Sequence, residues 1–364
     1  MSATALPNRQ DHREQPHRPA LTPAPRRILV KELNWLGDLV MSLPALRAIR
    51  STWPAAQLAV LVKQELAGFF DGEDSIDEVI PYAIARGIRG IRDRKRVIAQ
   101  IRVRRFDLAV MFPNSFDSAL LTALARVPRR AGYSADARSP LLTLKAAPPQ
   151  DALCGHQANY WLAMVRETLG VEGSAGDFAL SPHQPHRSKM QQWLAARRER
   201  PQARLVALAP FAAYGPAKEW PAPKWTRLID VLAEHGESEC VLVGTPSERN
   251  RCEQIAATAK AGALIAAGET SVGELIALLS LAGLVIGNDS GATHLAAALG
   301  TPTVGIFGST DPAWSAPLGP RTSVVYRKVE CSPCHARTCR FGHHRCLEEL
   351  EVAEVASAAE SFRA

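Results

Sequence analysis

Residues Leu284–Pro312, LVIGNDSGATHLAAALGTPTVGIFGSTDP, decide the fold of this chain. The apolar run Leu284–Ile286 predicts a strand that is buried on both faces. A glycine-containing turn, Gly287–Gly291, ends that run, and helix-forming residues follow as far as Leu299. A second strand is expected at Thr303–Phe307. The order strand, turn, helix, strand indicates a parallel α/β unit whose turn lies at the carboxyl end of its first strand.

Open parallel sheets bind ligands at the carboxyl ends of their strands, where unpaired N–H groups and the helix dipole attract anions. The turn and the helix after it carry candidate ligand-binding residues of the kinds that such a pocket uses, namely Asp289, Ser290, Gly291, Thr293 and His294. The two hydroxyl groups can donate hydrogen bonds to a phosphate, and the histidine lies about one helical turn further on. The other interpretation is a plain capped helix, with Asp289 or Ser290 as its N-cap.

The length and composition favour a globular protein of two domains. Its 364 residues exceed what one ordinary core needs, and 46% of them are hydrophobic. No apolar run reaches the roughly 18 residues of a membrane span, and the polar N-terminus does not resemble an export signal, so we expect a cytoplasmic location. The 43 basic and 36 acidic residues give a net charge of +7, which favours an acidic partner such as a nucleotide, an anionic membrane or nucleic acid.

Strands and helices are predicted to alternate in two series of similar size, which indicates an α/β fold of two Rossmann-like domains facing each other across a cleft. Residues 1–25, which contain Pro, His, Arg and Gln, are expected to form a disordered N-terminal arm. The domains are expected at 26–182 and 183–364, divided near Pro182–Pro185. A final helix, Glu348–Ala359, is expected to pack back onto the body of the molecule.

The first half offers a candidate catalytic carboxylate. The predicted strand Arg27–Lys31 leads into the turn Asn34–Asp38, and a helix with an apolar face follows. Gly37 permits a close approach of backbone and ligand. Asp38 stands at the helix start, where the dipole keeps a carboxylate ionised. Asp38 is therefore either a base or a simple N-cap.

A basic amphipathic helix is predicted at Arg86–Arg105, because arginines surround an apolar stripe of helical spacing. Such a helix can touch anionic lipid or an acidic acceptor. A solvated helix face is the other interpretation of a charge run like this one.

Two loops of the second half, Ala213–Lys218 and Gly244–Glu248, also follow predicted strands. With a carboxylate of the first half to deprotonate an incoming hydroxyl, Lys218 and the helix start at Ser290–Gly291 would stabilise a departing phosphate. Glu248 is placed to accept hydrogen bonds from a ribose, or else simply opens a helix. This set of groups suits transfer from a diphosphate-activated donor.

Four cysteines near the C-terminus, Cys331, Cys334, Cys339 and Cys346, lie among several histidines. The first pair has the spacing of metal ligands, so a structural zinc or iron site is one interpretation. The later gaps are irregular, and reduced, unligated cysteines are the other. The transfer chemistry outlined above requires no metal.

Seven stretches, in order between about residues 27 and 349, resemble the ADP-heptose:lipopolysaccharide heptosyltransferases of glycosyltransferase family 9, most of all the heptosyltransferase II enzymes. They are KELNWLGDLVMSLPALRAIR, FPNSFDSALLTALA, RRAGY, AKEWP, LVGTPSE, GNDSGATHLAAALGTPTVGIFGSTDP and CSPCHARTCRFGHHRCLEEL. The resemblance implies a GT-B fold and inverting, metal-independent transfer of L-glycero-D-manno-heptose from ADP-heptose. The implied acceptor is the heptose/Kdo inner core of lipopolysaccharide, at the cytoplasmic face of the anionic inner membrane. Another acceptor, the first core heptose position or a protein, stays open.

The resemblance also implies residue roles. Asp38 matches the general base, Lys218 the phosphate-binding lysine and Glu248 the ribose-binding residue. The expected donor pocket consists of Gly37, Asp289, Ser290, Gly291, Thr293 and His294, and the candidate acceptor-binding residues are Asn114 and Ser115. One departure is Ala213-Tyr214, which stands where related enzymes often have hydroxyl residues, so the phosphate contacts of that loop are in doubt.

Two other functions fit less well. A nucleic-acid-binding module would need aromatic residues interleaved with the arginines, and Arg86–Arg105 contains none, so no nucleic-acid partner is expected. A dinucleotide-dependent oxidoreductase would need a Gly-x-Gly-x-x-Gly turn after the first strand, and Lys31–Asp38 contains a single glycine.

Overall fold

The computed structural model of the chain describes residues 21–85, 87–149, 155–234 and 237–362, without the side chain of Ile88. Residues 1–20 of the predicted disordered arm lie outside this part. The last five residues of that arm are held on the protein: Leu21 packs against the core, and the Pro23 carbonyl accepts a 2.7 Å hydrogen bond from Arg129 Nη1. The boundary of the arm at residue 25 stays a prediction, and the contacts of Leu21 and Pro23 are ones that the sequence alone did not reveal.

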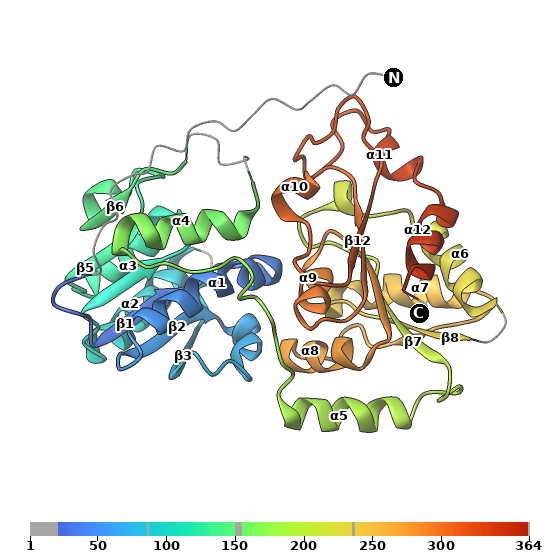
Figure 1. The fold of residues 1–364 in the computed structure, drawn as a ribbon, viewed down its shortest axis with the longest axis horizontal. Coiled ribbons are helices and arrows are strands. Elements are labelled where there is room, and N and C mark those ends of the chain that lie inside the picture. The colour runs from blue at the N-terminus through green and yellow to red at the C-terminus, as the bar shows by residue number, and fades with distance from the viewer. Residues whose placement is uncertain (1–20, 86, 150–154, 235–236, 363–364) are drawn as a thin grey trace, which may run out of the picture.

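The first lobe is a six-stranded parallel sheet in the order β3-β2-β1-β4-β5-β6, with helices on both faces (Figure 1). Its strands are β1 (Arg27–Lys31), β2 (Gln57–Lys63), β3 (Glu78–Tyr82), β4 (Leu108–Met111), β5 (Arg129–Tyr133) and β6 (Leu144–Ala146). Its helices are α1 (Leu36–Thr52), α2 (Ile88–Val103), α3 (Phe116–Leu124) and α4 (Gln157–Leu169). The strands β1, β2 and β4 are almost wholly buried, which explains their continuous apolar runs.

The second lobe repeats the plan with a parallel sheet in the order β12-β11-β10-β7-β8-β9. Its strands are β7 (Arg204–Ala209), β8 (Ser238–Leu242), β9 (Leu264–Ile265), β10 (Leu284–Asn288), β11 (Thr303–Phe307) and β12 (Thr322–Tyr326). Its helices are α5 (Gln184–Ala195), α6 (Ala222–Ala233), α7 (Arg249–Thr258), α8 (Val272–Leu281), α9 (Gly291–Ala298), α10 (Pro312–Ser315), α11 (Arg345–Glu348) and α12 (Val352–Glu360). The two sheets confirm the predicted α/β class.

Strand order reverses once in each sheet, between β1 and β4 and between β7 and β10. At such a point the connections leave the sheet in opposite directions, and a crevice opens beyond the strand ends. Asp38 follows β1 in the first turn of α1, Lys218 lies in the loop after β7, and Asp289 directly follows β10. The fold thus puts these three segments at the switch points of the two sheets.

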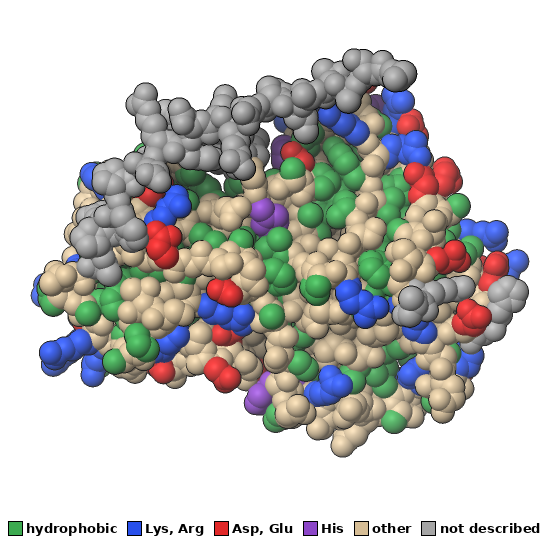
Figure 2. Space-filling view, in the orientation of Figure 1, with side chains coloured by type: hydrophobic (Ala, Val, Ile, Leu, Met, Phe, Trp, Pro, Cys, Tyr) green, Lys and Arg blue, Asp and Glu red, His purple; other side chains and the backbone are tan. Residues whose placement is uncertain are grey.

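The lobes meet along α1 of the first and α9 of the second (Figure 1). Residues 171–183 connect them, and the Leu180 amide donates to the Ala298 carbonyl on α9 over 2.8 Å. Beyond this connection, α5 packs against α8 beneath the second lobe. On the face drawn in Figure 2, basic and acidic side chains are interspersed among the described residues and do not merge into one basic field. Within the described residues, every helix is too short or too polar to cross a membrane.

Candidate active site

Asp38 lies in the first turn of α1 and points into the line where the lobes meet. Its Oδ1 accepts a 3.3 Å hydrogen bond from Gln157 Nε2, at the start of α4. Burial raises the pKa of Asp38 to about 6, although the charges of His294 and Lys218 and the Gln157 hydrogen bond oppose that rise. The two second-lobe residues are therefore close enough to act electrostatically on the carboxylate.

Lys218 and Asp289 form a buried ion pair on the other side of the cleft. Lys218 Nζ lies 2.5 Å from Asp289 Oδ2, which also accepts a 2.5 Å hydrogen bond from Thr310 Oγ1. Burial alone would raise the pKa of Asp289, but the nearby His294 side chain and the Lys218 charge outweigh it and lower that pKa to about 2. The carboxylate thus stays ionised and fixes the ammonium group in place.

His294, on α9, occupies the space between the two carboxylates. Its side chain is buried, and its Nε2 lies 3.6 Å from Asp289 Oδ1. A methyl group added to Gly37 would lie 2.8 Å from His294 Cδ2, so the absence of a side chain at Gly37 admits the ring. The other ring nitrogen, Nδ1, is buried and has no hydrogen-bond partner among the described residues.

The start of α9 faces the first lobe directly. A methyl group at Gly291 would lie 2.7 Å from Leu36 Cβ, so the backbone of one lobe touches a side chain of the other. Ser290 Oγ is buried without a partner among the described residues. Thr293 Oγ1, in contrast, donates to the carbonyl groups of Ser290 and Asn288 at 2.7 and 3.2 Å. The Ser290 hydroxyl remains available to an anion, whereas the Ser290 amide donates to Thr293 Oγ1 over 3.4 Å and the Thr293 hydroxyl stabilises the turn.

Glu248 lies apart from this group of residues, at the end of the loop after β8. Its Oε2 accepts a 2.7 Å hydrogen bond from the Thr245 amide, which is the geometry of a helix start. The carboxylate has a second oxygen that can accept from a ligand. The helix-start interpretation is therefore present in the structure, and ribose binding by Glu248 stays a prediction.

The acceptor candidates lie further along the first sheet. Both ends of the Asn114 amide are engaged: Nδ2 donates to Tyr160 Oη over 2.7 Å, and Oδ1 accepts from Arg138 Nη2 over 3.1 Å. Ser115 is exposed and is the N-cap of α3. Asn114 therefore serves the packing of the first lobe, and acceptor binding by this pair stays a prediction.

The family model for glycosyltransferase family 9 (heptosyltransferase) matches residues 94–345, more than half of the chain. The chain belongs to this family. A lipopolysaccharide heptosyltransferase 2 of Salmonella typhimurium is 29% identical to it over 89% of this chain and 97% of the relative. The structure of E. coli ADP-heptose lps heptosyltransferase II covers 92% of this chain and 98% of its own, with a TM-score of 0.78 and 24% identity. A family 9 glycosyltransferase of Veillonella parvula has a TM-score of 0.82 over 94% and 98% of the two chains, at 20% identity.

These structures confirm the GT-B arrangement, and the family makes the chain a glycosyltransferase. In this family 9 enzyme the sequence failed to identify two polar residues of the site, Gln157 and Thr310. Gln157 reaches Asp38 from a helix 119 residues later in the chain, so no local pattern connects the two. Thr310 lies in the segment that follows β11, where a threonine gives no local signal of a site.

The cysteines of the C-terminal segment gather around Cys346. Burial, followed by the nearby thiols of Cys331, Cys334 and Cys339, raises the pKa of Cys346 to about 11. All four are free thiols. Within the described residues, no group of three or more His, Cys, Asp or Glu side chains is arranged to hold a metal ion. A metal at these cysteines therefore remains a sequence-based prediction without support from the structure.

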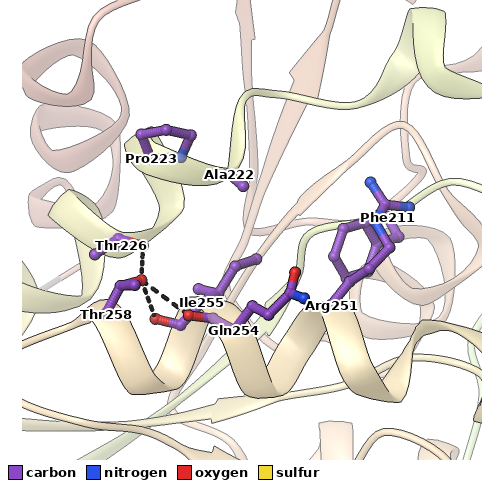
Figure 3. Close-up of a pocket in the computed structure, with 8 residues that line it drawn as sticks. All are labelled: Phe211, Ala222, Pro223, Thr226, Arg251, Gln254, Ile255 and Thr258. Carbon is purple, nitrogen blue, oxygen red and sulfur yellow. Dashed lines mark hydrogen bonds between the residues drawn. The ribbon is translucent and has the colours of Figure 1, made fainter.

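A separate pocket of about 360 Å³ lies between α6 and α7 (Figure 3). Phe211 and Arg251 lie at one end of it, with the guanidinium 3.8 Å from the ring centre, and Thr226 and Thr258 share a 2.9 Å hydrogen bond at the other. None of the residues predicted for the donor or acceptor site lines this pocket. The candidate active site is instead the line where the two lobes meet.

Proposed function

We propose that this enzyme transfers L-glycero-D-manno-heptose from ADP-heptose to the inner core of lipopolysaccharide, as a heptosyltransferase II. The single observation that carries the proposal is the meeting of Asp38, from the first lobe, with Lys218 and His294, from the second. The names of the relatives support the donor and the acceptor: one is a lipopolysaccharide heptosyltransferase 2, and another an ADP-heptose lps heptosyltransferase II.

The proposed reaction is a single displacement without a metal ion. Asp38 takes the proton of an acceptor hydroxyl, and the hydroxyl oxygen forms a bond to the anomeric carbon of the heptose. The bond from that carbon to the phosphate oxygen breaks on the opposite face, so the configuration inverts. ADP leaves with the electron pair, and Lys218 and the start of α9 stabilise its new charge.

The neighbours of Asp38 support the role of base. A group with a pKa of about 6 is mostly ionised at neutral pH and accepts a proton better than an ordinary aspartate does. Gln157 orients one carboxylate oxygen, which leaves the other for the acceptor. On the donor side, Ser290, Gly291 and Lys218 would hold the diphosphate, and Glu248 would accept a hydrogen bond from the ribose.

We further propose that α2 and α3 lie on the anionic inner membrane at its cytoplasmic face. The two helices run side by side, tied by Arg94 Nε to Asp117 Oδ1 at 2.8 Å and by Arg102 Nη2 to the Leu124 carbonyl at 2.6 Å. Their exposed large apolar side chains are Ile91, Val103, Phe116 and Leu124. Helix α2 also carries five arginines and one lysine against one aspartate. Exposed apolar groups among basic ones are typical of a membrane-surface helix.

The proposed function is tested by supplying purified enzyme with ADP-heptose and truncated core acceptors. We expect ADP release and a gain of one heptose, measured by mass spectrometry, only with an acceptor that already carries the first heptose. Turnover with a heptose-free Kdo core, or with a protein, would instead identify the alternative acceptors. An absence of turnover with every acceptor, or an Asp38→Asn variant as fast as wild type, would contradict the proposal.

A further inference from the structure

The cysteine-rich segment 331–346 lies against the loops that form the donor side of the cleft. The amides of Cys334 and His335 donate to the Ser309 carbonyl over 3.0 and 2.8 Å. The hydroxyl group of Tyr214, in the loop after β7, donates a 2.7 Å hydrogen bond to the His335 carbonyl. The segment is therefore fixed both to the loop after β11 and to the loop that carries Lys218.

Arg337 is the residue of this segment that contacts the lysine loop most closely. The Ala217 amide donates to the Arg337 carbonyl over 3.1 Å. A methyl group added to Gly215 would lie 2.5 Å from that same carbonyl oxygen, which leaves no space for a side chain. The φ of Gly215, +149°, also disfavours any residue other than glycine. The backbone of Arg337 is thus held in one position beside Lys218.

The Arg337 side chain lies near aromatic rings of both lobes. Its guanidinium carbon lies 5.1 Å from the ring centre of Tyr214 and 6.0 Å from that of Trp35, which belongs to the first lobe. Lys218 Nζ lies 4.8 Å from the same Tyr214 ring. Two cations therefore share one aromatic ring, and stacking on that ring favours the planar guanidinium.

Among the described residues, only one of these two cations has an ion-pair partner. Asp289 pairs with Lys218, whereas the Arg337 side chain is exposed and makes no hydrogen bond or ion pair with any described residue. An unpaired guanidinium beside another cation attracts an anion, and its donors match phosphate and carboxylate oxygens in pairs. The Ser309 hydroxyl and His294 Nδ1, both buried and without partners among the described residues, are further groups that a ligand could satisfy.

The same geometry resolves the departure noted in the loop Ala213-Tyr214. The Ala213 side chain has no hydrogen-bond donor, and the Tyr214 hydroxyl already donates to the His335 carbonyl. This pair therefore supplies the cleft with an aromatic platform and no hydroxyl donor. The Arg337 guanidinium lies near the Tyr214 ring and provides hydrogen-bond donors from a different part of the chain.

We propose that Arg337 is an anion-binding residue of the cleft, which takes a phosphate or carboxylate oxygen of a ligand held between Trp35 and Tyr214. The cysteine-rich segment carries it there. The inference rests on the proposed function only for the source of the anion, which is either the diphosphate of the donor or an acid group of the acceptor.

The test compares Arg337→Ala with Arg340→Ala, which removes the same charge from an exposed arginine of the same segment. Calorimetry measures the binding of ADP and of inorganic pyrophosphate, and steady-state kinetics measures KM for the core acceptor. Loss of a charge-assisted hydrogen bond predicts a weakening of about tenfold or more for Arg337→Ala and less than twofold for Arg340→Ala. Arg337→Lys, which keeps the charge and loses the paired donors, should fall between wild type and Arg337→Ala.

Weaker binding of ADP and pyrophosphate assigns the anion to the donor diphosphate, and a raised KM for the acceptor alone assigns it to the acceptor. The inference is overturned if Arg337→Ala stays within twofold of Arg340→Ala in all three measurements. Wild-type enzyme that binds pyrophosphate as tightly as ADP would count against the proposed function, while the comparison of the two variants would still decide the role of Arg337.

Discussion

Asp38 combines a carboxylate with surroundings that move its titration towards neutral pH. Because burial raises its pKa to about 6, the base loses its ionised form at a higher pH than an ordinary aspartate, whose value is 3.8. We expect kcat/KM to fall tenfold per pH unit below about pH 6, as measured in initial-rate assays with a pH-stable coupling system. Asp38→Asn should lose roughly 10²–10⁴-fold in rate and retain ADP binding. An acid limb near pH 4 in wild type would show that another group is titrating.

Gln157 positions Asp38 and stabilises its ionised form by donating to Oδ1. Gln157→Leu removes that donor, so the pKa of Asp38 should rise further and the acid limb should move to higher pH, by a few tenths to about one unit. Gln191→Leu, the same change at an exposed residue of α5, is the matched control. A lower rate with an unmoved limb would indicate that Gln157 only shapes the site.

Some residues of the site can be predicted from a single sequence and others cannot. Asp38, Lys218 and Asp289 follow strands, and strand ends in parallel sheets gather at one edge, so their meeting was predictable from chain order. Gln157 and Arg337 reach the cleft from segments without such a signal. Their positions depend on how α4 and the cysteine-rich segment pack, which local patterns do not encode.

At the scale of elements, the starts of α1 and α9 fit together through glycines. A methyl group at Gly291 would lie 2.7 Å from Leu36 Cβ, so Gly291→Ala should force the two helices apart. Overpacking of this kind costs about 1–3 kcal/mol of folding stability, so we expect a lower midpoint of urea unfolding, and the displacement of α9 should lower kcat/KM as well. The double variant Gly291→Ala/Leu36→Gly removes the contacting Cβ and should recover much of the lost stability and rate. Gly176→Ala, whose new methyl group meets nothing closer than 3.4 Å, is the control.

The surface of α2 and α3 gives a second prediction for elements. Ile91→Asp/Phe116→Asp replaces two exposed apolar side chains on neighbouring helices and reduces the positive charge, so sedimentation with anionic vesicles should fall about tenfold or more. Transfer to a soluble, lipid-free acceptor should not change. Phe341→Asp, at an exposed position of the second lobe, is the control. Equal sedimentation of wild type, the double variant and Phe341→Asp would contradict the proposal that α2 and α3 form the membrane-binding surface.

Some elements escaped prediction for identifiable reasons. The strand β6 has three residues, and β12 is only half-buried along its whole length, so neither has the continuous apolar run of the central strands. Both lie at sheet edges. The stretch Pro182–Pro185 was expected to mark the boundary between the domains, yet helix α5 already begins within it. Pro185 lies in the first turn of that helix, where proline is tolerated.

For the whole molecule, the two lobes share one apolar core. A single cluster of buried residues includes Leu39 and Leu46 of α1 together with Ala277 of α8 and Leu295 of α9. Side chains on both sides of the domain boundary therefore exclude water jointly. A ligand that rigidifies the donor-side turns of the second lobe should therefore also reduce the motion of the first lobe.

Hydrogen exchange measured with and without ADP tests this coupling. ADP is proposed to contact the second lobe, yet Leu36 packs on Gly291 and Gly37 on His294. We therefore expect amides at the start of α1 to be protected together with those of α9, because opening either helix exposes the other. Helix α2, on the first lobe, is separated from the second-lobe contacts by its own sheet and should be unchanged. Protection confined to the second lobe would mean that the lobes respond independently, and that closure around the acceptor requires more than the donor nucleotide.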